Sequence, residues 1–158
     1  MTEKNTKDNL NYFPSINGNN EQLLNLLLKT SELLCKWYSD TDKGSPLPFN
    51  KKFRVSYPQK FGSNINNLLV EIEDLIYTSF CPSHPGSLAN LDPPPLTISI
   101  IGDLIASGLN NNLLAEELSP SISNLENDLC EWLSKKIGFK ENSGGIAASG
   151  GTLNNLNA

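Results

Sequence analysis

The chain has 158 residues, of which 38% are hydrophobic, 18% charged and 8% aromatic, and its formal net charge is −5 at pH 7. This length is enough for one domain with a hydrophobic core but short for two. An acidic chain without a basic run is a poor candidate for binding nucleic acid through its phosphates or for binding an anionic membrane surface.

The cysteines and the single histidine exclude an intrinsic metal site of the zinc type. Cys35, Cys81 and Cys130 are widely spaced and His84 is the only histidine, whereas a zinc cage needs about four ligands at close spacings. Three unclustered cysteines argue against a disulfide framework and favour a reducing compartment, where they would be small core residues. Residues 1–20 lack the apolar stretch of a signal peptide, so we expect a cytoplasmic protein.

The predicted elements of the first half are two helices and a long loop. Residues 1–19 are expected to be disordered or loosely attached, and leucines at helical spacing predict a helix from about residue 20 to Tyr38. Residues 40–60 contain a glycine and three prolines and are predicted to form an irregular loop. The second helix is predicted from a cap at Ser63 to about Phe80, because apolar residues recur at i, i+3, i+4 and i+7.

The second half begins with a proline-rich loop at residues 81–95 and continues with helices. A third helix is predicted from about Leu96 to Leu109, before an asparagine run. A fourth is predicted from Ser119–Pro120, because a hydroxyl at the N-cap and proline at the first helical position mark a helix start, and it should end before Gly138. Its predicted buried face consists of Ile122, Leu125, Leu129, Trp132 and Leu133.

The segment after the fourth helix has the pattern most indicative of chemistry. Small residues at 144–149 are compatible with a short buried strand, and Ser-Gly-Gly-Thr at 149–152 leads into the first turn of another helix. Free N–H groups and a hydroxyl at a helix N-terminus bind phosphate, and glycine lets the phosphate approach the backbone. A plain strand-to-helix turn capped by Thr152 is the alternative. Because the chain ends at Ala158, inside this helix, we expect it to be part of a larger domain.

Other candidate residues have ordinary structural alternatives. Histidine often transfers protons near neutral pH, but His84 also suits a loop with no catalytic role. The prolines at 93–95 predict a stiff segment before the third helix, and Glu116 with Glu117 suits a solvated helix end as well as an acid–base pair. No local pattern supports a serine or cysteine hydrolase.

Several short motifs follow one another in a distinctive order. They are His84–Pro85, the prolines at 93–95, IGDLIASGLNNNLLAEELSP at 101–120, Leu125–Glu126, Trp132–Leu133, Ile137–Gly138–Phe139, Gly144–Gly145–Ile146 and Ser-Gly-Gly-Thr at 149–152 with Asn155–Leu156. Together they resemble the N-terminal part of group II pyridoxal-phosphate-dependent amino acid decarboxylases, which include aromatic amino acid, glutamate and L-2,4-diaminobutyrate decarboxylases. The resemblance covers about residues 64–158. The proline-rich loop and the Ser-Gly-Gly-Thr form are most similar to the diaminobutyrate type or a related bacterial branch.

The resemblance implies a fold class and a division of the chain. The chain would be mainly α, with an N-terminal helical dimerisation segment at residues 20–114. Residues 115–158 would be the first strand and helix of a fold-type I, aspartate-aminotransferase-like α/β domain. The complete enzyme would be a homodimer that binds pyridoxal 5′-phosphate at the subunit interface and decarboxylates an amino acid.

The resemblance also implies site residues. Gly150, Gly151 and Thr152 would hold the cofactor phosphate, in agreement with the helix N-terminus predicted there. The residues expected to line the substrate pocket are His84, Asn90, Pro93, Pro94, Asn112 and Leu114.

Two departures from the family limit the implied activity. Gly86, Ser87 and Leu88 replace the aromatic residues that many members have after the His-Pro pair, which argues against an aromatic substrate. The family's Schiff-base lysine, the aspartate that pairs with the pyridine nitrogen and the ring-stacking histidine all come later in the family's sequences. We therefore predict no catalytic residue, no metal ligand and no decarboxylase activity in these 158 residues alone. A standalone helical interaction module without catalysis is the alternative function.

Overall fold

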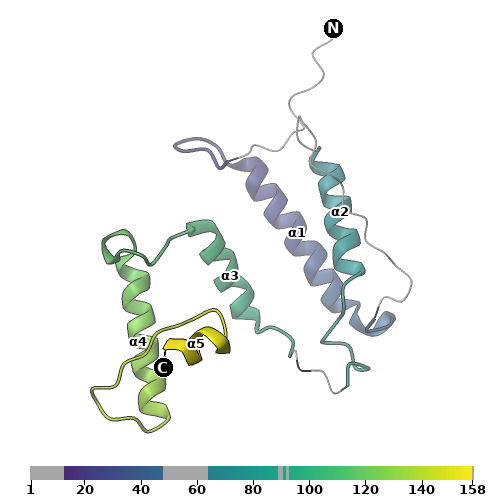
Figure 1. Ribbon diagram of the computed structural model, residues 1–158. Helices are drawn as coiled ribbons and strands as arrows, with labels where there is room; N and C mark the ends of the chain where they lie inside the picture. Colours follow the sequence, from purple (N-terminus) through teal and green to yellow (C-terminus); the bar gives the residue numbers. More distant parts are fainter. Residues whose placement is uncertain (1–12, 48–63, 89–90, 92, 158) are drawn as a thin grey trace. The chain divides into compact units, whose positions relative to one another are not determined.

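Helices make up most of the computed structural model, which describes residues 13–47, 64–88, 91 and 93–157 (Figure 1). The mainly α class and the four long helices expected from the sequence are confirmed, with small shifts at the helix ends. The elements are α1 (Glu21–Ser39), η2 (Thr41–Lys43), α2 (Ile65–Tyr77), α3 (Thr97–Leu109), η3 (Glu116–Leu118), α4 (Pro120–Lys136) and α5 (Gly151–Asn157).

The chain forms two units, Met1–Pro94 and Pro95–Ala158. In the first unit α1 and α2 lie side by side and pack against each other as a helical pair (Figure 1). The second unit contains α3, α4, α5 and the short η3, which packs against the start of α4. The division at residues 114 and 115 expected for the complete enzyme stays a prediction.

Asparagine and glycine set several helix ends. Asn64 is the N-cap of α2, and its Oδ1 accepts a hydrogen bond from the Asn66 N–H at 2.8 Å. The expected cap, Ser63, lies outside the described residues. Asn110 ends α3 in the left-handed conformation at φ 46°, which asparagine tolerates better than most residues. Gly138, at φ 88°, follows α4 as the sequence predicted.

Ser119 and Pro120 begin α4 as predicted, but the serine hydroxyl has a different role from the expected one. The Ser119 Oγ donates a hydrogen bond to the Asn112 carbonyl at 2.8 Å and does not cap the helix N–H groups. Ser119 is only 2% exposed, so its hydroxyl requires a partner inside the protein. This contact closes the loop that connects α3 to α4.

The predicted buried face of α4 is wrong for this structure. Four of its members, Leu125, Leu129, Trp132 and Leu133, are between 46% and 65% exposed. Helical spacing gathers apolar side chains on one face, but the surface that would cover that face has to come from elsewhere. The expected core position of Cys35 is also wrong, because its side chain is exposed. The described residues that are buried are Cys81, Ser119 and Ser134.

The predicted buried strand at residues 144–149 is not present. These residues are irregular, and Ile146 is 63% exposed. A strand needs a neighbouring strand to complete its hydrogen bonds, and the described part of the chain provides none beside this segment. The helix expected after it does form, as α5, so the strand-and-helix start of a fold-type I domain is not confirmed.

We expect the isolated chain to self-associate through α3. This helix contains a single charged residue, Asp103, and its side chains Ile98, Ile101 and Ile105 are 72%, 46% and 55% exposed. Large exposed apolar patches drive association in water. Sedimentation velocity should show oligomers or aggregates, and a double change of Ile98 and Ile105 to Lys should increase the monomer fraction. Replacing the exposed Ser107 by Lys is the control and should change little; a wild-type chain that stays monomeric would contradict the prediction.

Candidate functional site

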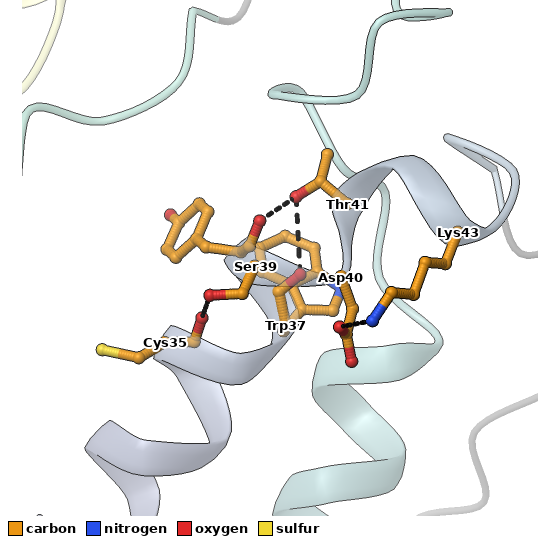
Figure 2. A network of polar contacts seen from close by, with 7 residues as sticks. Cys35, Trp37, Ser39, Asp40, Thr41 and Lys43 are labelled. Carbon is orange, nitrogen blue, oxygen red and sulfur yellow. Dashed lines mark hydrogen bonds and ion pairs between the residues drawn. The ribbon is translucent and has the colours of Figure 1, made fainter.

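The end of α1 is closed by hydroxyl groups that bond back to the helix (Figure 2). The Ser39 Oγ donates to the Cys35 carbonyl at 3.0 Å. The Thr41 Oγ1 lies 2.5 Å from the Tyr38 carbonyl oxygen and 3.4 Å from that of Trp37. The Thr41 bonds satisfy carbonyl groups that a helix leaves open in its last turn, and they fix the start of the loop after α1.

Two exposed ion pairs each shift the pKa of one partner. The hydrogen bond to Asp40 raises the pKa of Lys43 (Figure 2). The hydrogen bond from Lys135 lowers the pKa of the Glu131 carboxyl. The Lys43 pair stabilises the fold below the usual lysine pKa and loses this effect as pH rises through the raised value. The Glu131 pair stabilises it above the usual glutamate pKa and loses this effect as pH falls through the lowered value. Both contributions are small because the pairs are exposed to water.

His84 connects two loops of the first unit. Its Nε2 lies 2.9 Å from the Gly44 carbonyl oxygen, and its Nδ1 accepts a hydrogen bond from the Gly86 N–H at 2.8 Å. Because a carbonyl oxygen can only accept, Nε2 carries the proton and Nδ1 does not. The Cys81 N–H strengthens the connection by donating to the Pro46 carbonyl at 3.0 Å. Both ring nitrogens thus have a structural use, and a place for His84 in the substrate pocket stays a prediction.

Replacing His84 by Ala should loosen the turn at residues 84–87. The change removes the acceptor of the Gly86 N–H and the donor to the Gly44 carbonyl. We expect the Gly86 amide to exchange its hydrogen about three- to tenfold faster, which corresponds to the loss of one ordinary hydrogen bond. Hydrogen exchange followed by mass spectrometry would measure this, with the α1 peptides as the internal control. Unchanged exchange at Gly86 would mean that the histidine ring does not hold the turn.

The other predicted pocket residues fall into two groups. Asn90 lies outside the described residues, and Pro93 and Pro94 are exposed at the end of the first unit. In the second unit the Asn112 Oδ1 accepts a hydrogen bond from the Leu114 N–H at 3.1 Å, while the Leu114 side chain is 92% exposed. Each group is therefore placed within its own unit, and their assembly into one pocket stays a prediction.

The predicted phosphate site forms an open turn at the start of α5. The Gly150 carbonyl accepts hydrogen bonds from the N–H groups of Leu153 and Asn154, both at 3.1 Å. Within the described part of the chain, the N–H groups of Gly151 and Thr152 have no acceptor. A Cβ added to Gly150 or Gly151 would meet no atom within 4 Å. Two N–H donors and the Thr152 hydroxyl are thus open to a ligand.

These features fit the phosphate end of a cofactor. A phosphate requires several hydrogen-bond donors and close access to the backbone, and Gly151 with Thr152 offers both. The turn provides no group that could act on the ring of pyridoxal phosphate. The assignment of Gly150, Gly151 and Thr152 to the phosphate stays a prediction with a compatible geometry.

Two residues of α4 hold the segment before this turn, and neither was among the predicted site residues. A Glu126 carboxylate oxygen accepts a hydrogen bond from the Ala147 N–H at 2.8 Å. Cys130 packs close to Gly145, since a Cβ on that glycine would lie 3.3 Å from the Cys130 Cβ. Leu125–Glu126 is one of the motifs of the family resemblance, but a contact across 21 residues cannot be found from local spacing.

Among the described residues, no helix is both long and apolar enough to span a bilayer, and no group of three His, Cys, Asp or Glu side chains could bind a metal.

Two grooves of about 330 Å³ each lie along α1 and α2 and contain none of the predicted site residues. One groove is lined by Lys29, Glu32, Leu33, Lys36, Leu69, Val70 and Glu73. The other is lined by Gln22, Asn25, Leu26, Lys29, Asn64, Ile65 and Asn66.

Comparison with known proteins relates part of this chain to a decarboxylase. The chain is 33% identical over 100 residues to an L-2,4-diaminobutyrate decarboxylase from Acinetobacter baumannii. The similarity covers 63% of this chain and 20% of the decarboxylase, so the chain spans about a fifth of that relative's length. No protein-family model matches the chain. The relationship is thus to one part of a decarboxylase.

Proposed function

We propose that this chain is the N-terminal part of a pyridoxal-phosphate-dependent decarboxylase that converts an L-amino acid to an amine and CO2. The observation that carries this proposal is the 33% identity over 100 residues to a diaminobutyrate decarboxylase. The motif order from His84 to Thr152 is consistent with that identity. The exposed apolar faces of α3 and α4 also support it, because they suit helices that pack against further protein surface.

In this proposal the turn at the start of α5 anchors the cofactor. The N–H groups of Gly151 and Thr152 and the Thr152 hydroxyl donate hydrogen bonds to phosphate oxygens, and Gly150 leaves room for the phosphate. When bound, pyridoxal phosphate supplies an electron sink for the electron pair left by the departing CO2. This chain contributes binding and orientation, and the residues that act on the ring belong to the rest of the enzyme.

We propose a substrate without an aromatic ring, and L-2,4-diaminobutyrate is the first candidate. The chain has Gly86, Ser87 and Leu88 after its His-Pro pair, so the aromatic side chains typical of many family members are missing there. The pocket residues would be His84, Asn90, Pro93, Pro94, Asn112 and Leu114. The complete enzyme would be a cytoplasmic homodimer.

Radiometric release of CO2 tests this function. The complete protein that contains this chain would be incubated with L-2,4-diaminobutyrate, L-glutamate or an aromatic amino acid, each with and without pyridoxal phosphate. We expect cofactor-dependent release from diaminobutyrate and little release from the aromatic substrate. Absence of release from all three substrates by the folded, cofactor-supplied protein would contradict the proposal.

A non-catalytic helical interaction module is the second candidate, because the exposed apolar side chains of α3 also suit a partner helix. The same assay separates the two functions. A module would show no effect of pyridoxal phosphate on any readout, including the thermal stability of the complete protein, whereas a cofactor enzyme is stabilised by its ligand.

A further inference from the structure

The segment before the predicted phosphate turn is held by one face of α4. After α4 the chain returns past the helix before α5 begins (Figure 1). Two residues of this returning segment contact α4 side chains. Ala147 donates its N–H to the Glu126 carboxylate at 2.8 Å. Gly145 lies against Cys130, where a Cβ would come within 3.3 Å of the Cys130 Cβ and 3.5 Å of its Sγ.

The spacing of the two contacts fixes the register of the segment on the helix. Glu126 and Cys130 are four residues apart, so they lie on the same face of α4 about 6 Å apart along its axis. Gly145 and Ala147 are two residues apart, which in an extended segment corresponds to about 6.6 Å. Alternate residues of the segment therefore meet successive turns of the helix, and a shift by one residue would lose both contacts.

The register determines where the phosphate turn can lie. Gly150 follows Ala147 by three positions, and three Cα-to-Cα steps span at most about 11 Å. Fixing the Ala147 amide on Glu126 thus restricts the position of Gly150 and of the open N–H groups that follow it. The Gly145 contact adds a steric restriction, because a Cβ at this position would lie 3.3 Å from the Cys130 Cβ and the two would have to separate by a few tenths of an ångström.

We propose that Glu126 and Cys130 are positioning residues, which place the Gly150–Thr152 turn for binding the cofactor phosphate. The phosphate-binding role of the turn rests on the proposed function. The two contacts with α4 do not depend on it. Glu126 acts as a hydrogen-bond acceptor and its charge is not required, so glutamine can replace it while alanine cannot. A Cβ on Gly145 would be tight against Cys130, whereas the adjacent Gly144 has no atom within 4 Å of an added Cβ.

Hydrogen exchange of the Ala147 amide in the 158-residue chain tests the contact without the cofactor. We expect Glu126→Ala to speed the exchange about three- to tenfold and Glu126→Gln to keep it within about twofold of wild type. Glu131→Ala is the matched control on α4, because that carboxylate bonds to Lys135 and not to the segment. Gly145→Ala should also speed the exchange, and Gly144→Ala should not. Equal exchange in Glu126→Ala and wild type would overturn the inference.

Titration of the complete protein with pyridoxal phosphate tests the purpose of the contact. We expect Glu126→Ala to weaken cofactor binding about three- to tenfold and Glu126→Gln to restore it. Faster Ala147 exchange with unchanged cofactor affinity would overturn the positioning role while leaving the proposed function intact. A wild-type protein that binds no pyridoxal phosphate would overturn the cofactor role together with the proposed function.

Discussion

The purified 158-residue chain should release no CO2 from any amino acid, even with excess pyridoxal phosphate. The cofactor reacts through a lysine amine, which has to be deprotonated to attack, and enzymes achieve this by lowering the lysine pKa. The Asp40 carboxylate has the opposite effect on Lys43, whose pKa is raised. The family places its reactive lysine later in the sequence, and no lysine in this chain follows a histidine directly.

Borohydride trapping gives this prediction a second readout. Pyridoxal phosphate would be added to the chain, the mixture reduced, and the labelled lysines located by mass spectrometry. We expect weak labelling spread over several lysines, because in our proposal the reactive lysine belongs to the rest of the enzyme. The complete protein, treated in parallel, should carry one label per chain at one lysine. A single stoichiometric label in the 158-residue chain, with release of CO2, would show that the chain contains its own active lysine.

Local sequence patterns predicted the helices because the signals for helix starts and stops lie within a few residues of one another. The Ser119–Pro120 pair marks the start of α4, and Gly138 follows its end at φ 88°. The detail of the caps was less predictable, because several polar side chains compete for each helix end. At α2 the cap is Asn64, and at α4 the Ser119 hydroxyl bonds to the Asn112 carbonyl instead of the helix.

Burial was not predictable from the same patterns. The apolar spacing of α4 correctly groups Leu125, Leu129 and Trp132 on one face, yet all three are more than half exposed. An apolar pattern predicts that a helix face will be buried, but it does not specify which other surface covers that face. The missing strand at residues 144–149 has the same cause, because a strand needs a partner to complete its backbone hydrogen bonds.

The candidate site divides in the same way between local and long-range features. Ser-Gly-Gly-Thr predicted a helix start directly after the motif with open N–H groups, and α5 begins at Gly151, two residues earlier and inside the motif. Local spacing could not connect Glu126 to the Ala147 amide or His84 to the Gly44 carbonyl, because these bonds join residues 21 and 40 positions apart. Such contacts depend on how the chain returns on itself.

Replacing Thr152 by Val in the complete protein should weaken pyridoxal phosphate binding about ten- to a hundredfold. Valine keeps the shape of threonine but removes its hydroxyl, and a hydrogen bond to a charged phosphate contributes about 1.5–3 kcal/mol. The Thr152 side chain is exposed at the start of α5, so the fold should tolerate the change. Cofactor titration would measure the affinity, and circular dichroism would confirm the helix content.

Two further variants separate the hydroxyl from the open space around the backbone. Thr152→Ser keeps the hydroxyl and should bind pyridoxal phosphate within a few-fold of wild type. Gly151→Val adds a side chain where the structure leaves open space, so the chain should still fold while the phosphate loses its access to the backbone. If Thr152→Val and Gly151→Val both bind the cofactor as tightly as wild type, the phosphate is held elsewhere. Loss of binding in both variants, with binding kept in Thr152→Ser, would place the phosphate at the start of α5. These changes share only their effect on the hydroxyl and the backbone access at residues 151 and 152.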